Sequence, residues 1–169
     1  MERVLDRVKE LEREGFQFEG ADGSVELLVR RARDDYRPPF TLLGFHVLVK
    51  EGNGSGMVSE ATVKVAVNGE VIHTASEGNG PVDALNAAVR KAILPHYPHL
   101  AEVRLTDYKV RILDEQAGTA ARTRVLITSS DHKHSWSTVG SSANIIEASW
   151  YALSDALEYA ILIMEKERV

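Results

Sequence analysis

The stretch ATVKVAVNGEVIHTASEGNGPVDALNAAVRKAI, residues 61–93, contains the signals that decide the fold. Apolar and polar residues alternate on both sides of Asn68-Gly69, and this dipeptide favours a type I′ turn. Residues 61–67 and 70–75 are therefore predicted to pair as a β-hairpin. Pro81 then occupies the first position of a helix whose apolar residues keep helical spacing as far as Ile93. Before this stretch, apolar and polar residues also alternate over residues 40–49, which predicts a third strand.

A second unit with the same order of elements follows. Strands are predicted at residues 102–113, 123–128 and 134–139, and a helix at residues 144–165. Phe45-His46-Val47 aligns with Tyr108-Lys109-Val110 and Asp83-Ala84 with Glu147-Ala148, at an offset of about sixty residues. The sequence thus predicts an α+β fold built by internal duplication of a βββα unit. Each unit contributes a three-stranded antiparallel sheet with its packed helix.

Two short helices are predicted before the first unit. The first has apolar residues at helical spacing and ends at Gly15, and the second has Asp22 or Ser24 as its N-cap and ends before Pro38-Pro39. The predicted organisation is a helical linker subdomain at residues 1–36, followed by a domain at residues 37–169. That domain contains the two repeats, at about residues 40–95 and 101–165.

Composition narrows the class of protein. The net charge is −5, from 25 acidic and 20 basic residues, so the chain has no general attraction for nucleic acid. There is no cysteine, which fits a reducing compartment, and we expect a cytoplasmic protein. The longest apolar run, Ile161 to Met164, is far too short to cross a membrane, and no leader peptide is expected.

Each repeat has a small polar turn where its third strand meets its helix. The two turns are Glu77-Gly78-Asn79-Gly80-Pro81 and Gly140-Ser141-Ser142-Ala143-Asn144. Free N–H groups at a helix start, together with the helix dipole, favour a carboxylate or a phosphate. One such turn is most simply a helix cap, and Asn144 with Glu147 forms a capping box. Two turns at equivalent positions of a duplicated unit predict a small-ligand site.

Other motifs do not indicate chemistry. The glycine-rich run at residues 51–56 lacks the lysine of a phosphate-binding loop and is predicted to be a flexible loop between strands. His132 and His134 have the spacing of a two-histidine chelate on a strand, but Asp131 is the one further ligand in reach. No nucleophile elbow is present. We expect no catalytic residue, no metal site and no cofactor in this chain.

Several ordered stretches carry a resemblance to a known family. The chain resembles the C-terminal regulatory domain of the α-isopropylmalate synthase family, and within it the citramalate synthase branch. The matching stretches span nearly the whole chain: residues 15–21 (GFQFEGA), 59–65 (SEATVKV), 77–85 (EGNGPVDAL), 107–110 (DYKV), 118–121 (GTAA) and 144–150 (NIIEASW).

The resemblance implies a regulatory role. In that family an N-terminal barrel condenses acetyl-CoA with a 2-oxo acid and uses a divalent metal, and this chain has no counterpart of that barrel. It is expected to be the detached regulatory domain, a homodimer that binds isoleucine or leucine and transmits inhibition to the barrel through its N-terminal helices. The stretches at residues 15–21 and 27–30 favour the citramalate branch, and hence isoleucine as effector. Leucine regulation in an isopropylmalate synthase and a dimerisation module without an effector are the alternatives. An unrelated small-molecule enzyme of α+β fold is a third.

Residue types suggest how an amino acid would be held. The effector carboxylate is expected to bind backbone N–H groups of the two turns. Its ammonium group is expected to pair with a carboxylate of Asp83, Asp107 or Glu147, and its side chain to be enclosed by apolar and aromatic residues. The expected effector-binding residues are Gly78, Asn79, Gly80, Pro81, Val82, Asp83, Asp107, Tyr108, Ser141, Ser142, Ala143, Asn144, Ile145 and Ile146.

A homodimer is also predicted from apolar residues of the last helix. Trp150 and the run Ile161-Leu162-Ile163 exceed what one helix face is expected to bury within a single chain.

Overall fold

The computed structural model describes residues 2–52, 54 and 56–166. It confirms the α+β fold: the strands form two three-stranded antiparallel sheets, ordered β1-β2-β3 and β4-β5-β6. The chain divides into two compact units, which are described separately. The first-repeat unit is Pro38–Ala101, and the second-repeat unit combines Met1–Arg37 with Glu102–Val169.

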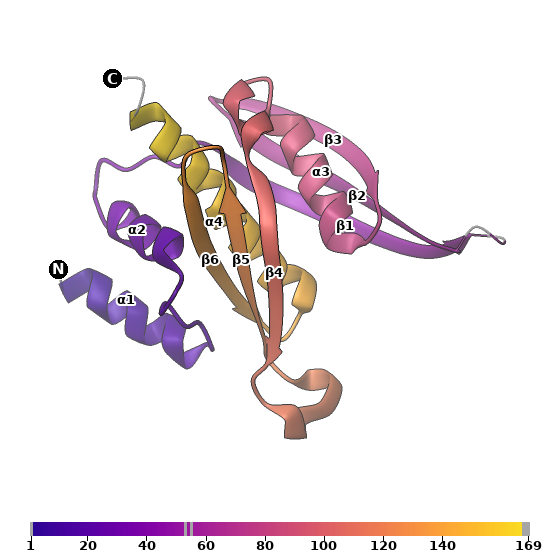
Figure 1. Cartoon of the computed structure of the whole chain (residues 1–169), viewed down its shortest axis with the longest axis horizontal. Coiled ribbons are helices and arrows are strands. Elements are labelled where there is room, and N and C mark those ends of the chain that lie inside the picture. Colours follow the sequence, from indigo (N-terminus) through magenta and orange to yellow (C-terminus); the bar gives the residue numbers. More distant parts are fainter. Residues whose placement is uncertain (1, 53, 55, 167–169) are drawn as a thin grey trace. The chain divides into compact units, whose positions relative to one another are not determined.

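The first-repeat unit contains β1 (Thr41–Gly52), β2 (Gly56–Val67), β3 (Glu70–Gly78) and α3 (Pro81–Ile93) (Figure 1). The predicted Asn68-Gly69 hairpin is confirmed, with φ of 50° and 81°. β1 and β2 are longer than predicted, because their pairing continues through the glycine-rich run to Gly52 and Gly56. Of the predicted loop at residues 51–56, Asn53 and Ser55 lie outside the described residues.

Helix α3 covers one face of its sheet. The side chains of β2 that face it alternate along the strand and are fully buried, as the period of a strand requires. Pro81 begins α3 as predicted. The fully buried apolar residues of β2 and α3 are Ala61, Val63, Val65, Val67, Ala84, Leu85, Ala88, Val89, Ala92 and Ile93.

The second repeat contains β4 (Arg104–Ile112), β5 (Thr123–Ser130), β6 (Ser135–Ser142) and α4 (Ile145–Lys166), with a 3-10 turn, η2, at Glu115–Ala120. A further 3-10 turn, η1 (Pro98–Glu102), precedes β4, so this strand begins two residues later than predicted. The prediction that residues 140–142 belong to a turn is wrong, because they continue β6 and pair with residues 123–125 of β5. Small residues suit this strand end because α4 crosses it closely: a Cβ on Gly140 would lie 2.0 Å from the carbonyl oxygen of Ala148.

The two repeats share local details that support the duplication. Each first strand has one irregularity in its register, between Leu42 and Gly44 in β1 and between Leu105 and Asp107 in β4. Both lie two or three residues into the strand. A regular hairpin has no need of such an irregularity, so its recurrence at the same place indicates common descent of the two units.

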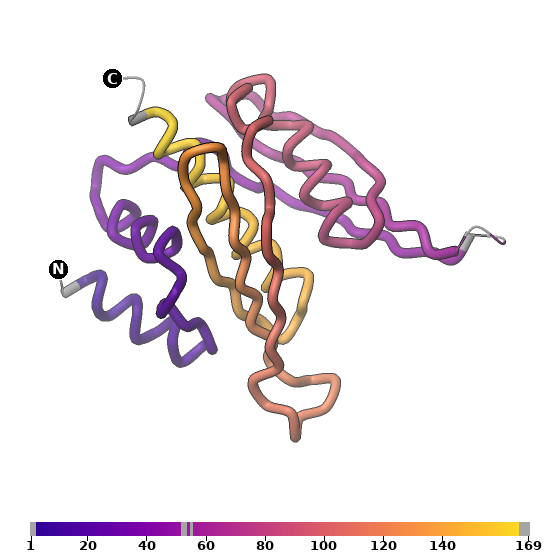
Figure 2. The backbone as a smooth tube through the Cα atoms, viewed as in Figure 1, coloured from indigo at the N-terminus to yellow at the C-terminus, as the bar shows by residue number. Residues whose placement is uncertain are grey.

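Helices α1 (Glu2–Arg13) and α2 (Asp22–Arg31) are confirmed, and α2 packs against α4 and β6 (Figure 2). The predicted N-caps of α2 are wrong. The residue before the helix is Ala21, whose side chain cannot cap. The carboxylate of Asp22 accepts the N–H of Ser137 at 3.0 Å, and the hydroxyl of Ser24 accepts the N–H of Val139 at 3.1 Å. Both side chains therefore bind β6 rather than their own helix.

Candidate functional site

The junction of β3 and α3 brings together the first group of expected effector residues, residues 78–83. The prediction that Glu77 and Gly78 belong to a turn is wrong, because they end β3 and pair with Glu60 and Ser59 of β2. Gly80 is extended, with φ −155° and ψ 172°, and no side chain caps the helix. The N–H of Asn79 donates to the carboxylate of Asp83 at 2.9 Å. The N–H groups of Val82 and Asp83 lie in the first turn, where a helix offers them no acceptor. This helix start therefore keeps backbone donors for an anion.

Gly78 has a different role from Gly80. A Cβ on Gly78 would lie 2.4 Å from the backbone nitrogen of Ala84, whereas a Cβ on Gly80 would meet nothing within 4 Å. Gly78 is thus required so that β3 can approach α3, and Gly80 is free to vary without a clash.

The turn before α4 is largely satisfied by its own side chains. The amide oxygen of Asn144 accepts the N–H groups of Ile146 at 2.9 Å and Glu147 at 3.3 Å. The hydroxyl of Ser142 accepts the N–H of Asn144 at 3.0 Å and donates to the carboxylate of Glu147 at 2.5 Å. Half of the predicted capping box is therefore confirmed, since Asn144 caps the helix. Glu147, however, binds Ser142 instead of the N–H of Asn144.

Tyr108 and Ile145 lie around the first turn of α4. The hydroxyl of Tyr108 lies 2.6 Å from the hydroxyl of Ser149, which in turn donates to the carbonyl of Ile145 at 2.6 Å. Ile145 is 44% exposed. Asp107 is on the other face of β4 because successive strand residues alternate, and it pairs with Lys109 at 2.8 Å. This hydrogen bond holds the pKa of Asp107 below its usual value.

Ser141 and Ala143 complete the second group. Ser141 is buried, and its hydroxyl donates to the carbonyl of Glu14 at 2.8 Å, which ties β6 to the end of α1. Ala143 is exposed between β6 and α4. The structure thus gathers Tyr108, Ala143 and the start of α4 in one unit, and residues 78–83 in the other.

A buried polar network joins α2 to α4, and sequence reasoning did not find it. The guanidinium of Arg31 donates to Asp155 at 2.8 Å and to Glu158 at 2.6 Å. The hydroxyl of Tyr36 also donates to Glu158, and the hydroxyl of Ser24 donates to Asp155 at 2.7 Å. Glu158 is only 4% exposed. A signal existed in the sequence, since Glu158 is a carboxylate beside Leu157 and Ile161 on a buried helix face.

The network shifts the pKa values of its members. Burial alone would lower the pKa of Arg31, but the hydrogen bonds and charges of Glu158 and Asp155 hold it above its usual value. Burial raises the pKa of Asp155, against the opposing effects of Arg31 and Ser24. Burial and the bond to Glu158 raise the pKa of Tyr36. One guanidinium thus binds two carboxylates of α4, and these hydrogen bonds fix α2 on α4.

A cavity of about 820 Å³ lies beside this network in the second-repeat unit. Its walls come from α1, α2, the segment between them and the buried side of α4 and β6. The rings of Phe16 and Phe18 stack at 6.1 Å, and Phe16 lies 6.3 Å from the ring of Tyr151. The lining residues are Arg3, Val4, Arg7, Leu11, Glu14, Phe16, Phe18, Leu28, Arg31, Ala32, Arg33, Asp34, Val139, Trp150, Tyr151, Ser154 and Asp155.

The apolar surface on which the dimer prediction rested is only partly exposed, since Leu162 and Ile163 are half-buried and the other two residues are buried. Trp150 is 7% exposed and Ile161 is fully buried, because α4 packs its apolar face on β5 and β6 within the same unit. Exposed apolar side chains of this unit lie along β4, where Leu105 is 39%, Val110 is 42% and Ile112 is 54% exposed, and also on its helices, at Leu5, Val25, Val29, Ile145 and Tyr151.

The two-histidine pattern is in a turn. Residues 131–134 connect β5 to β6, so His132 and His134 are not alternate residues of one strand as expected. Asp131 accepts the N–H groups of Lys133 at 2.7 Å and His134 at 2.6 Å. Among the described residues no group of three or more histidine and carboxylate side chains is placed to hold a metal ion. Within the same part of the chain, no helix combines the length and hydropathy needed to cross a bilayer.

Comparison with known proteins identifies the family. A family model described as the LeuA allosteric (dimerisation) domain matches residues 19–161. The chain is 48% identical over its whole length to an (R)-citramalate synthase of Aquifex aeolicus and covers 32% of that protein. It is 50% identical, over 94% of its length, to an (R)-citramalate synthase of Geobacter sulfurreducens and covers 30% of it.

A more distant relative belongs to the other branch. A 2-isopropylmalate synthase of Aquifex aeolicus is 32% identical over 98% of the chain, which covers 29% of that protein. The chain therefore spans about a third of the length of the curated relatives it matches. With the match to the family model extending over most of its residues, the chain belongs to the family of LeuA allosteric (dimerisation) domains.

Proposed function

We propose that this chain is the regulatory and dimerisation domain of a citramalate synthase and that it binds isoleucine for feedback inhibition. The observation that carries the proposal is a difference in sequence identity. The chain is 48% identical to an (R)-citramalate synthase over its whole length, but 32% identical to a 2-isopropylmalate synthase of the same organism. This difference favours isoleucine over leucine as the effector. Regulation of this kind requires a coupling free energy of about 1 to 3 kcal/mol between the effector site and the catalytic site.

The chain itself is proposed to have no catalytic activity. Condensation of acetyl-CoA with a 2-oxo acid, and the divalent metal it uses, belong to the barrel of the longer enzyme. The N-terminal helices connect to that barrel and transmit the effector signal. We place this enzyme in the cytoplasm.

The start of α3 is the part of the expected effector site best suited to a carboxylate. It has no side-chain cap, and the N–H groups of Val82 and Asp83 point out of the helix start. The carboxylate of Asp83 is exposed beside them and suits an ammonium group. At the start of α4, by contrast, Asn144 and Ser142 already occupy three N–H groups. We therefore assign the effector carboxylate to the start of α3.

A homodimer is part of the proposal, supported by the family description and by the exposed apolar residues of β4. Light scattering should give a mass of twice 18.7 kDa at micromolar concentration. A mass of 18.7 kDa at all concentrations would exclude the dimer.

Calorimetric titration with isoleucine, leucine and valine tests the effector. Saturable binding of isoleucine, at least about tenfold tighter than that of the other two, supports the proposal. Preference for leucine would assign the chain to isopropylmalate synthase regulation. Binding of none of the three would leave a dimerisation module and would overturn effector binding.

A further inference from the structure

Three arginines lie together on the face of the second-repeat sheet that α4 does not cover. Arg111 of β4 is directly opposite Arg124 of β5 in the register of the two strands. The side chains of Val125 and Ile127 are fully buried under α4, so the alternation of a strand places Arg124 on the other face. Arg122 precedes Arg124 by two residues and shares this face. We call Arg111, Arg122 and Arg124 the arginine cluster.

The end of α1 confirms where Arg122 lies. A Cβ on Gly15 would be 2.9 Å from the Cδ atom of Arg122 and 2.7 Å from the hydroxyl of Ser141. Ser141 faces away from α4, since its neighbour Gly140 is the residue of β6 that α4 crosses. The arginine cluster therefore lies beside the segment that follows α1, wholly within the second-repeat unit.

The cluster has an excess of positive charge. Like charges directly opposite each other on neighbouring strands repel, and burial together with the charge of Arg111 holds the pKa of Arg124 below its usual value. Among the described residues, no carboxylate forms an ion pair with any of the three guanidinium groups. Lys109, the preceding cation on this face of β4, is by contrast paired with Asp107 at 2.8 Å.

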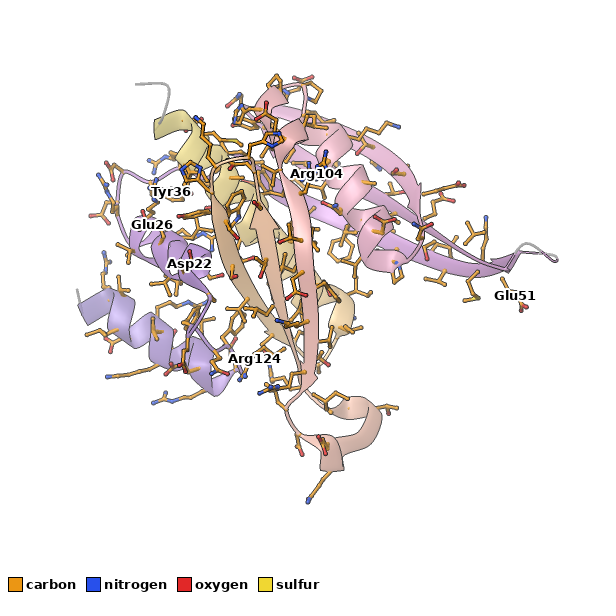
Figure 3. All side chains as sticks on the ribbon, in the orientation of Figure 1. Asp22, Glu26, Tyr36, Glu51, Arg104 and Arg124 are labelled. Carbon is orange, nitrogen blue, oxygen red and sulfur yellow. The ribbon has the colours of Figure 1, made fainter. Side chains whose placement is uncertain are left out.

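The cluster uses only part of its donors, and the acceptors are uncharged. Arg122 donates to one backbone carbonyl at the end of α1 at 2.9 Å, and Arg124 donates to the next at 2.7 Å. Arg124 also donates to the side-chain oxygen of Gln17 at 2.6 Å, and Figure 3 shows Arg124 beside the end of α1. The side chain of Arg111 is exposed and donates to no residue that the structure describes. Each guanidinium has five N–H donors, so donors remain on all three.

We propose that the arginine cluster is an anion site that takes a phosphoryl group. A phosphate monoester has a charge of about −1.5 to −2 at pH 7 and three acceptor oxygens, which matches several guanidinium groups better than a singly charged carboxylate does. The planar fork of arginine binds such oxygens in pairs. The anion lies between Arg111 and Arg124, where it removes their repulsion. It shares Arg124 with a carbonyl at the end of α1, so its binding is coupled to the attachment of that helix.

Three probe ligands test the class of anion. Pyrophosphate presents phosphoryl groups alone, ADP presents them on a nucleoside, and acetate is a singly charged control. In calorimetry at constant ionic strength, pyrophosphate should bind the full chain at one site, at least about tenfold tighter than acetate. Tighter binding of ADP than of pyrophosphate would support a nucleotide as the source of the group, and equal binding would support the group alone. No saturable pyrophosphate binding at millimolar concentration, or equal binding of acetate, would overturn the proposal.

Variants of two arginines on β4 locate the probe. Arg111→Gln should weaken pyrophosphate binding at least about fivefold, and its fold should persist because the side chain is exposed. Arg104→Gln is the matched control, since it removes the same charge from an exposed residue of β4 that is roughly 20 Å away along the strand, and it should change the affinity less than about twofold. Arg111→Lys keeps the charge without the fork and should weaken binding less than Arg111→Gln does. Unchanged affinity in Arg111→Gln, or equal weakening by Arg104→Gln, would reject the site.

Isoleucine titration of the same variants keeps this inference separate from the proposed function. None of the three arginines is an expected effector residue, so isoleucine affinity should be the same in Arg111→Gln as in the unmodified chain. Loss of isoleucine binding together with pyrophosphate binding would mean that both ligands use one site, which would overturn the assignment of a separate anion site.

Discussion

The hydroxyl of Thr138 on β6 donates to the backbone carbonyl of Ala152 on α4 at 2.6 Å, 14 residues further along the chain. The first repeat contains the same bond, from Thr74 on β3 to the carbonyl of Ala88 on α3, at 2.7 Å and with the same separation of 14 residues. In both repeats the third strand is therefore fixed to its helix by one hydroxyl. The duplicated unit thus preserves the position of the helix on its sheet.

Removing these hydroxyls should destabilise both repeats, and the second more than the first. Thr138 is fully buried, whereas Thr74 is partly exposed, so Thr138→Val loses a bond that water cannot replace. We expect Thr138→Val to lower the free energy of unfolding by about 1 to 1.5 kcal/mol and Thr74→Val by about 0.5 to 1 kcal/mol. Urea denaturation measures both, with the corresponding Thr→Ser variants as controls. A larger effect of Thr74→Val would contradict this order.

Gly78 and Gly80 should respond oppositely to the same added methyl group. Gly78→Ala forces a Cβ against the backbone of Ala84, so we expect it to cost about 2 kcal/mol or more of unfolding free energy. Gly80→Ala adds its Cβ to open space at an extended backbone and should change stability by less than about 0.5 kcal/mol. Thermal unfolding of the two variants compares them directly. Equal destabilisation would contradict the difference in packing.

The periodic parts of this fold could be predicted from the sequence. Alternation in residues 61–67 and the Asn68-Gly69 turn specify β2, β3 and their register, because strand period and turn geometry are local properties. The duplication followed from aligned residues and is confirmed by the matched sheets. The positions of the strand ends were predicted less accurately. β1 and β2 pair as far as Gly52 and Gly56, because this pairing depends on the partner strand and not on the side-chain pattern.

Features that depend on distant partners could not be predicted. Asp22 and Ser24 look like helix caps, but they bind backbone groups of β6, 115 residues away. Arg31 is one of several arginines at the end of α2, and nothing in the local pattern shows that its carboxylate partners are on α4, 124 and 127 residues further on. Trp150 appeared to be available for a dimer, but its own unit buries it. The cavity is formed by the same long-range packing, and no periodicity marks it.

Loss of the Arg31 guanidinium should detach α2 from α4. Arg31→Met leaves Glu158, 4% exposed, without its cation, and we expect a loss of about 2 to 3 kcal/mol in unfolding free energy. Arg33→Met breaks only an exposed pair with Asp35 and should cost less than about 0.5 kcal/mol. Hydrogen exchange should show faster exchange across α1 and α2 in Arg31→Met alone. Unchanged exchange there would show that apolar packing holds these helices without the network.

The effector carboxylate can be located by altering the two helix starts separately, with a methyl group at α3 and with charges at α4. Gly80→Ala should weaken isoleucine binding at least about tenfold, because the methyl group obstructs the approach to the Val82 and Asp83 amides. Ala143→Asp and Ala143→Lys place opposite charges at the exposed start of α4 and should change isoleucine affinity less than about threefold if the carboxylate binds at α3. Gly44→Ala, on β1, is the matched glycine control, since its Cβ also meets nothing within 4 Å. If Ala143→Asp weakens binding and Gly80→Ala does not, the site is at α4.

The stability of the β5–β6 turn should depend on the charge of Asp131. Burial opposes the shift, but the N–H groups of His134 and Lys133 and the ring of His134 hold the pKa of Asp131 below its usual value of 3.8. Because the folded pKa is the lower one, the folded state binds fewer protons than the unfolded state between the two values. The contribution of the carboxylate to stability is therefore complete above pH 3.8 and is lost as the pH falls through the folded pKa.

Asp131→Asn keeps the acceptor oxygen and removes the charge, so it should lower the free energy of unfolding by about 1 kcal/mol at pH 6 and by progressively less below pH 3.8. Urea denaturation of both proteins from pH 6 to pH 3 measures the difference. A difference that stays constant over this range would show that the charge of Asp131 does not stabilise the turn.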